Sequence, residues 1–203
     1  MMQHIFKQGI DKTKPILLLL HGTGGNEVDL LPLADVIDKE ASVLSVRGNV
    51  MENGMPRFFR RLAEGVYDEE DLVFRTEELD TFLDSASKEY GFDRSNIIAI
   101  GYSNGANIAA SLLFHHKDSL KGAILHHPLF PREGAEWPNL TGIPVYISAG
   151  QNDPFCPAVE STALQNKMII AGADVHAHWE SNGHSLTQTE VQAAADWYQK
   201  CTS

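Results

Sequence analysis

A serine lies between two glycines at the end of an apolar run. Residues 97–106 read Ile-Ile-Ala-Ile-Gly-Tyr-Ser-Asn-Gly-Ala, so Ser103 fits the pattern G-x-S-x-G between a predicted strand and a predicted helix. A sharp turn at this point exposes the hydroxyl and leaves no room for side chains at Gly101 and Gly105. The pattern predicts a nucleophile for acyl transfer, and a chance Gly-Ser-Gly turn is the alternative.

A carboxylate follows a later apolar run. Asp153 lies in Gly-Gln-Asn-Asp-Pro, directly after the predicted strand 145–148. Asn and Asp before proline favour turns on their own account, but the position after a strand favours a catalytic acid. Asp174 is the competing acid, and it stands at the entry to the predicted strand 175–179.

A histidine that could act as the base must follow the acid in this order of residues. His176 and His178 share one face of the predicted strand 175–179, so we interpret them as strand residues. His184 lies in the loop Ser-Asn-Gly-His-Ser after that strand. A loop position allows its imidazole to reach Ser103 while an acid holds the other ring nitrogen.

A glycine-rich loop follows the first apolar run, in the order His-Gly-Thr-Gly-Gly at residues 21–25. Backbone N–H groups of Thr23 and of Asn104, the residue after the serine, are expected to form an oxyanion hole. A phosphate-binding loop is the alternative, but neither G-x-x-x-x-G-K-[ST] nor G-x-G-x-x-G is present. His21 precedes the serine and is interpreted as a structural loop residue.

Two adjacent histidines, His126 and His127, raise the alternative of a metal site. Adjacent strand positions point to opposite faces of a sheet, so the two side chains cannot easily bind one ion. We therefore expect no metal, and the chain shows no motif that requires a cofactor.

The elements that must position these residues alternate between strands and helices. Leu72, Leu79, Leu83, Ala86 and Tyr90 recur at helical spacing before Gly91, and Thr187-x-x-Glu190 is typical of a capping box before a final helix. Short apolar runs of strand length lie between the helical stretches, at 16–20, 43–46, 97–100, 123–125 and 145–148. This order predicts an α/β fold with a mostly parallel sheet, helices on both faces, a minimal cap and one domain over residues 1–203.

The composition excludes several classes of partner. Sixteen Lys and Arg against 27 Asp and Glu give a net charge of −11, which disfavours nucleic acid and anionic membranes. No apolar run is long enough to span a bilayer. Two cysteines, Cys156 and Cys201, are too few for a disulfide scaffold and favour the cytoplasm. Cys156 is expected to be a buried, inert thiol, with a reactive thiol as the alternative, and a homodimer is compatible with the sequence.

The segment between 49 and 67 is expected to shape the substrate pocket. The apolar side chains expected to line the pocket are Met51, Met55, Phe58, Phe59 and, after the acid, Phe155. Arg57, Arg60 and Arg61 form the densest basic cluster. They either meet a carboxylate of the substrate or form salt bridges, which we favour, and the candidate partners are Glu64, Asp68, Glu69 and Glu70.

Over nearly its whole length the chain resembles the phospholipase/carboxylesterase family of α/β hydrolases, which includes acyl-protein thioesterases. The matching motifs are Leu20-His21-Gly22-Thr23-Gly24-Gly25, Gly101-Tyr102-Ser103-Asn104-Gly105, Gly150-Gln151-Asn152-Asp153-Pro154 and Gly183-His184-Ser185. It is most similar to small bacterial carboxylesterases associated with quinone and catechol stress, through Arg47-Gly48-Asn49, residues 55–61 and Leu125-His126-His127-Pro128. Asn104 stands where acyl-protein thioesterases usually carry glutamine, which argues against protein depalmitoylation.

Residues and resemblance together predict hydrolysis of a small-molecule carboxylic ester of short to medium acyl chain through an acyl-serine. A lysophospholipase, an acyl-thioesterase and a catalytically silent binding module are the alternatives. Serine at the turn disfavours a cysteine-type dienelactone hydrolase and a haloalkane dehalogenase.

Overall fold

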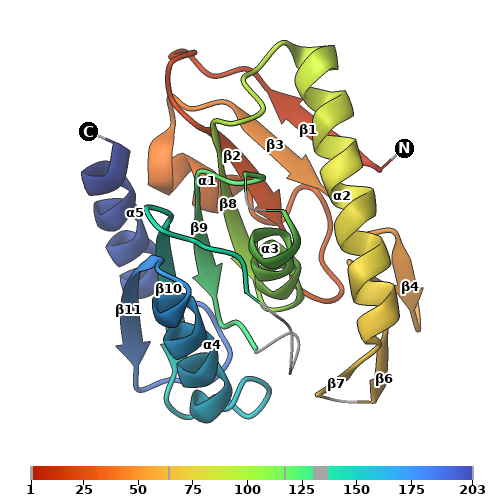
Figure 1. Cartoon of the computed structure of the whole chain (residues 1–203), viewed down its shortest axis with the longest axis vertical. Coiled ribbons are helices and arrows are strands. Elements are labelled where there is room, and N and C mark those ends of the chain that lie inside the picture. The colour runs from red at the N-terminus through yellow and green to blue at the C-terminus, as the bar shows by residue number, and fades with distance from the viewer. Residues whose placement is uncertain (1, 64, 117, 130–136, 203) are drawn as a thin grey trace.

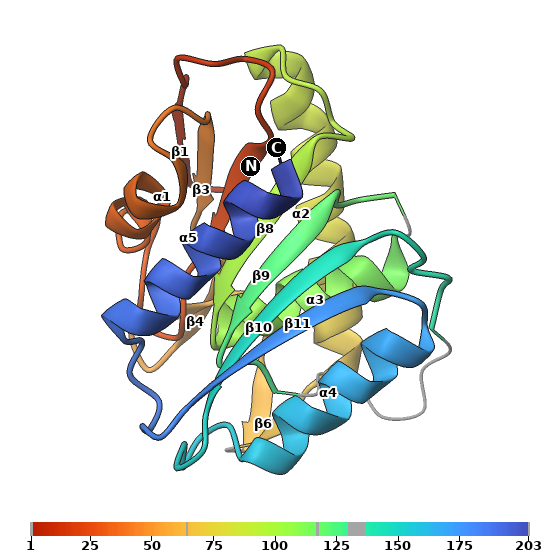
Figure 2. The same cartoon turned by 90° about the vertical axis from the view of Figure 1, so that its left-hand side faces the viewer.

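The computed structural model describes residues 2–63, 65–116, 118–129 and 137–202. Within them a sheet of seven strands in the order β1-β3-β2-β8-β9-β10-β11 has helices on both faces (Figures 1 and 2). Only β1 is antiparallel to its neighbour. The strands are β1 (His4–Lys7), β2 (Ile16–Leu20), β3 (Val43–Val46), β8 (Ile97–Tyr102), β9 (Gly122–His126), β10 (Pro144–Gly150) and β11 (Asp174–Glu180). This is the α/β-hydrolase fold predicted from the sequence.

Strand β2 shows why apolar runs form the centre of the sheet. Leu17 and Leu19 point into one core, and Leu18 and Leu20 point into the other, because side chains alternate along a strand. All four are fully buried, and each contributes roughly 1.5–3 kcal/mol to folding. A parallel strand covered on both faces therefore reads as a continuous apolar run.

The helices divide between the two faces of the sheet. Helices α2 (Glu69–Tyr90), α3 (Asn104–His115) and α4 (Ala158–Ile170) pack on one face, and α1 (Leu31–Asp38) and α5 (Gln188–Thr202) pack on the other. Gly91 ends α2 in a left-handed conformation with φ of 70°, as predicted. The predicted capping box also forms, because the N–H of Thr187 donates to Glu190 at 2.8 Å and the N–H of Glu190 donates to Thr187 Oγ1 at 3.2 Å.

Two short hairpins were not predicted. β4 (Val50–Glu52) pairs with β5 (Met55–Arg57), and β6 (Arg61–Ala63) pairs with β7 (Val66–Tyr67), all between β3 and α2. Their strands have two or three residues, which is too short for an alternating pattern to be recognised. Strand β1 and helix α4 were likewise absent from the sequence interpretation.

The parallel strands place the predicted reactive residues at one edge of the sheet. Ser103 follows β8, Asp153 follows β10 by a short loop, and His184 follows β11. Thr23 follows β2 in the same way. Because the carboxyl ends of parallel strands meet at one edge, residues far apart in the sequence come together there. Among the described helices, none is both long and apolar enough to cross a membrane.

Candidate active site

Ser103 lies in a strained turn between β8 and α3. Its φ of 53° and ψ of −114° are unusual for a residue with a side chain, and its N–H donates to the carbonyl of His126 at 2.9 Å. A Cβ at Gly101 would lie 2.5 Å from the carbonyl oxygen of Gly105, and one at Gly105 would lie 1.9 Å from that of Leu20. Gly101 is therefore required for the tight turn into α3, and Gly105 for close packing of α3 against β2.

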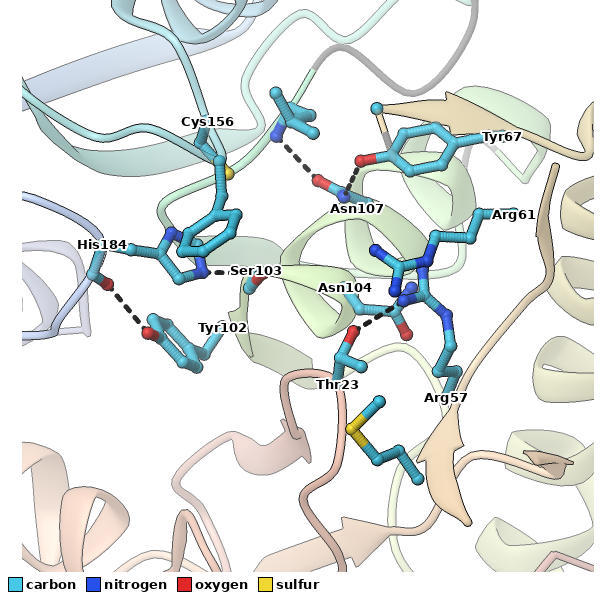
Figure 3. A pocket seen from close by; sticks show the side chains of 14 residues that line it. Thr23, Arg57, Arg61, Tyr67, Tyr102, Ser103, Asn104, Asn107, Cys156 and His184 are labelled. Atoms are coloured by element: carbon cyan, nitrogen blue, oxygen red, sulfur yellow. Dashed lines mark hydrogen bonds between the residues drawn. The ribbon is translucent and has the colours of Figure 1, made fainter. Parts of the chain in front are cut away.

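His184 contacts both Ser103 and Asp153. Its Nε2 lies 3.0 Å from Ser103 Oγ, and its Nδ1 lies 2.8 Å from Asp153 Oδ2. The phenol of Tyr102 donates to the carbonyl of His184 at 2.8 Å and fixes the loop that carries it (Figure 3). Ser103, Asp153 and His184, which were predicted to follow three different strands, thus lie within hydrogen-bonding distance of one another through His184.

The carboxylate of Asp153 is buried and fully used. Its Oδ1 accepts the backbone N–H groups of Phe155 and Cys156, each at 2.9 Å. Burial would raise the pKa of Asp153, but the hydrogen bonds from His184, from the Cys156 N–H, from His127 and from the Phe155 N–H outweigh burial and lower it. The side chain is therefore an anion at neutral pH, which is the state that can accept from His184.

Thr23 and Asn104 both border the same cavity as Ser103. Asn104 is the first residue of α3, so its N–H lies at the end of the helix where no intrahelical acceptor exists. Its side-chain oxygen accepts the N–H of Phe58 at 2.7 Å, and Arg57 Nη1 donates to Thr23 Oγ1 at 2.9 Å. These bonds tie Thr23 to the last residue of β5 and Asn104 to the residue that follows it.

The cavity beside Ser103 has a volume of about 460 Å³ (Figure 3). Met55 and Phe155, two of the residues expected at the substrate pocket, line this cavity together with Leu129. The prediction for three other apolar residues is corrected: Phe58 and Phe59 are 1% and 0% exposed, and Met51 is 63% exposed. The two phenylalanines pack inward against His21 and Tyr67, and Met51 faces solvent from β4. The two phenylalanines are therefore core residues and do not line the substrate pocket.

The arginine cluster forms salt bridges, as favoured, but only one of the acids, Asp68, is an expected partner. Arg57 and Arg61 lie 3.3 and 2.9 Å from Glu52. Arg60 lies 3.0 Å from Asp68, an expected partner, and 3.7 Å from Asp71. Glu64, another expected partner, lies outside the described residues. Arg57 and Arg61 also line the cavity, so two guanidinium groups face the place where substrate would lie.

The remaining histidines that were interpreted as structural have structural partners. His21 is buried, with Nδ1 2.6 Å from the carbonyl of Gly22, and its Nε2 accepts the N–H of Gly48 at 3.1 Å. His176 and His178 stack against Tyr146 within the sheet. These contacts account for the three side chains without a role at Ser103.

His127 and Glu190 were missed as residues near the acid. His127 Nδ1 lies 2.9 Å from Asp153 Oδ2, and its Nε2 lies 2.9 Å from Glu190 Oε1. His126, by contrast, contacts Ser148 Oγ at 2.7 Å, so the adjacent histidines have separate partners. The sequence does contain a signal for this site, because two adjacent histidines, His126 and His127, follow the apolar run 123–125.

Acid should weaken the fold through Glu190. Burial would raise the pKa of Glu190, but the contact with His127 and the N–H of Thr187 lower it to about 2. A carboxylate with a depressed folded pKa stabilises the fold above its unfolded pKa of about 4.3, and this stabilisation is lost as the pH falls toward 2. We expect urea unfolding to show a steeper loss of stability between about pH 5 and pH 3 in the wild type than in Glu190→Gln. Equal slopes would contradict this account of Glu190.

Comparisons with known proteins relate the chain to hydrolases. The model of the Dienelactone hydrolase family matches residues 60–203. The putative hydrolase MhqD of Bacillus subtilis (strain 168) is 55% identical over 199 residues, which are 98% of each chain. A Bacillus cereus carboxylesterase structure is 65% identical with a TM-score of 0.98, over 99% of this chain and 95% of that one. The structure of YahD with malic acid is 32% identical with a TM-score of 0.94 over the full length of both chains.

Proposed function

The chain belongs to the dienelactone hydrolase family and is an esterase-type hydrolase, and we propose that it cleaves carboxylic esters of short to medium acyl chain through an acyl-serine at Ser103. The expected resemblance to small bacterial carboxylesterases is confirmed by the Bacillus cereus enzyme. The observation that carries the proposal is the position of His184, within 3.0 Å of Ser103 Oγ and 2.8 Å of Asp153 Oδ2.

In the proposed acylation, Ser103 Oγ attacks the ester carbonyl and its proton passes to His184 Nε2. Asp153 holds the Nδ1–H of the resulting imidazolium, and the N–H groups of Thr23 and Asn104 stabilise the oxyanion. The tetrahedral intermediate collapses, and the alcohol leaves with the proton from His184. Water then attacks the acyl-serine with His184 as base, which releases the acid and restores Ser103.

The lining of the cavity supports a small acyl group. Its apolar part consists mainly of Met55, Leu129 and Phe155, and Arg57 and Arg61 line it as well. A long alkyl chain against the partly exposed guanidinium of Arg61 would remove its water without replacing the hydrogen bonds of that water. The malic acid in the YahD structure is a small polar acid and supports the same substrate size.

Chain length is therefore the direct test of the substrate proposal. We expect kcat/KM for p-nitrophenyl palmitate to be about tenfold or more below that for the butyrate, because desolvation of a guanidinium costs at least about 1.4 kcal/mol. Arg61→Leu should raise the palmitate-to-butyrate ratio, since it removes the charge but keeps the bulk. A wild-type preference for palmitate would contradict the proposed acyl site.

Other ester-like substrates share the proposed mechanism. Thioesters and lysophospholipids use the same nucleophile and base, so acyl-CoAs and lysolipids belong in the same assay panel. The arginines in the cavity lining, Arg57 and Arg61, argue against the long acyl chains of lysophospholipids. A catalytically silent binding module would hydrolyse none of the panel.

The proposed location is the cytoplasm, with a small-molecule ester as partner. Both cysteines are free thiols, as a reducing compartment favours. Cys156 is buried beside the cavity, and burial raises the pKa of its thiol, which supports an inert role. A homodimer remains part of the proposal that size measurement in solution would test.

A further inference from the structure

His127 lies between two buried carboxylates. Its Nδ1 is 2.9 Å from Oδ2 of Asp153, in the loop after β10, and its Nε2 is 2.9 Å from Oε1 of Glu190, in the first turn of α5. The second contact is an ion pair whose atoms are not aligned as a hydrogen bond. All three side chains have no exposed surface. Three different elements therefore converge on one imidazole.

The backbone of His127 is fixed in an unusual conformation. Its φ is 52°, in the left-handed region, although it carries a side chain. Its N–H donates to the carbonyl of Ser148 at 2.8 Å, and its own carbonyl accepts the Cys156 thiol at 3.1 Å. This conformation directs the ring toward Asp153 and away from the continuation of β9.

The contacts favour a proton on each nitrogen of His127. An ionised carboxylate only accepts hydrogen bonds, and Asp153 Oδ2 is approached by Nδ1 of both His127 and His184. A proton on Nε2 replaces repulsion between its lone pair and the Glu190 carboxylate, 2.9 Å away, by attraction. Burial would lower the pKa of His127, but the contacts with Glu190 and Asp153 outweigh burial and raise it. His127 is therefore a cation between two anions.

The other titratable groups near this cluster do not offset its charge. Burial raises the pKa values of Tyr102 and Cys156 and lowers that of His126 to about 4, so all three are neutral at pH 7. On β11, His178 pairs with Glu180 at 3.1 Å. The titratable groups that face His127 or Glu190 are Asp153, His184, Tyr102, Cys156, His126, Tyr146 and Glu180, and burial raises the pKa of Tyr146 as well.

We propose that His127 is a positioning residue of the active site: held as a cation by Glu190, it fixes the carboxylate of Asp153 against His184 and offsets one of the two buried negative charges. This inference rests on the proposed triad. The rings of His127 and His184 have centroids only 5.4 Å apart, so the charge on one acts on the protonation of the other. His127 thereby contributes a positive charge to the surroundings of the proposed base.

Removal of this cation should move the pH profile of the enzyme. In His127→Gln both carboxylates remain, so the surroundings of His184 carry one more net negative charge and favour its protonated form. We expect the acidic limb of kcat/KM to shift upward by about one pH unit, with a loss of about tenfold at its acid end and much less at the plateau. A purely structural role would lower the whole profile without moving the limb.

Two further variants separate charge from packing. His127→Gln/Glu190→Gln removes one positive and one negative charge, so its limb should return close to the wild-type position. His126→Gln replaces an adjacent, equally buried but neutral histidine, and its limb should not move. An unshifted limb in His127→Gln, or an equal shift in the double variant, would overturn the proposal.

The wild-type protein offers a test that needs no variant to fold. A long-range ¹H–¹⁵N spectrum of histidine side chains, with resonances assigned through the backbone, should show His127 with both ring nitrogens protonated at pH 7.5, and a neutral His127 would overturn the proposal. The failure of the proposed triad would look different, because a phosphonate probe would then leave Ser103 of the wild type unlabelled. Labelled Ser103 with coincident pH profiles would reject the role of His127 alone.

Discussion

Replacing Ser103 with alanine is expected to lower kcat for p-nitrophenyl butyrate by roughly 10⁴- to 10⁶-fold, because no acyl-enzyme can form. The Oγ atom removed lies 3.0 Å from His184 Nε2, so the variant loses the nucleophile and leaves His184 and Asp153 in contact. Steady-state and burst-phase kinetics on the folded variant would measure the loss. Weak residual hydrolysis is expected from the oxyanion donors alone.

Ser185→Ala is the matched control for this variant. Ser185 is an exposed serine next to His184, and its hydroxyl has no part in the proposed mechanism. Its kcat should stay within a few-fold of the wild type. Turnover by Ser103→Ala within tenfold of the wild type would mean that another group attacks the ester.

Replacing Gly105 with alanine is expected to destabilise the protein by about 3 kcal/mol or more. The added Cβ would lie 1.9 Å from the carbonyl oxygen of Leu20 and 2.6 Å from that of His21, both rigid backbone atoms. Helix α3 would have to move away from β2, and Ser103 would move with it. The denaturant midpoint and the esterase activity of the variant should therefore both fall.

Gly183→Ala is the control for this steric argument. A Cβ at Gly183 would meet its nearest neighbours at 3.7 and 3.9 Å, which is ordinary van der Waals contact. We expect its stability to change by less than about 1 kcal/mol. Similar midpoints for the two alanine variants would show that the turn can relax and would contradict the close packing of α3 on β2.

The central strands and the positions of Ser103, Asp153 and His184 follow from patterns that are local in the sequence. The five apolar runs became strands whose bounds differ by at most two residues at either end. Each predicted reactive residue lies directly after a strand or in the short loop beyond it, and the parallel sheet brings those ends together. The strand pattern, together with the rule that parallel strands end at one edge of a sheet, was therefore enough to predict that Ser103, Asp153 and His184 lie side by side.

The features that were missed depend on contacts between distant elements. Glu190 was recognised only as the acid of a capping box, which uses one of its oxygens, while the other lies beside His127. Nothing local to either residue indicates that α5 passes the end of β9. In the same way, nothing local in the sequence distinguishes Phe58 and Phe59, which are buried in the core, from residues that line a pocket.

The chain belongs to the dienelactone hydrolase family, but the residue at its nucleophile turn is serine and not cysteine. The turn residue is Ser103, and the two cysteines lie elsewhere: Cys156 is buried with its thiol bonded to the carbonyl of His127, and Cys201 is exposed on α5. A thiol-selective alkylating agent should therefore leave esterase activity intact, in keeping with a serine mechanism.

Labelling with a fluorophosphonate probe tests most directly whether Ser103 is the nucleophile. The probe reacts with a serine that the surrounding active site activates, and not with ordinary serines. Intact-mass and peptide analysis should find one adduct, on the peptide that contains Ser103, and loss of esterase activity in proportion to labelling. Full loss of activity without an adduct on Ser103, or stable esterase activity in fully labelled protein, would contradict the assignment of Ser103 as the nucleophile.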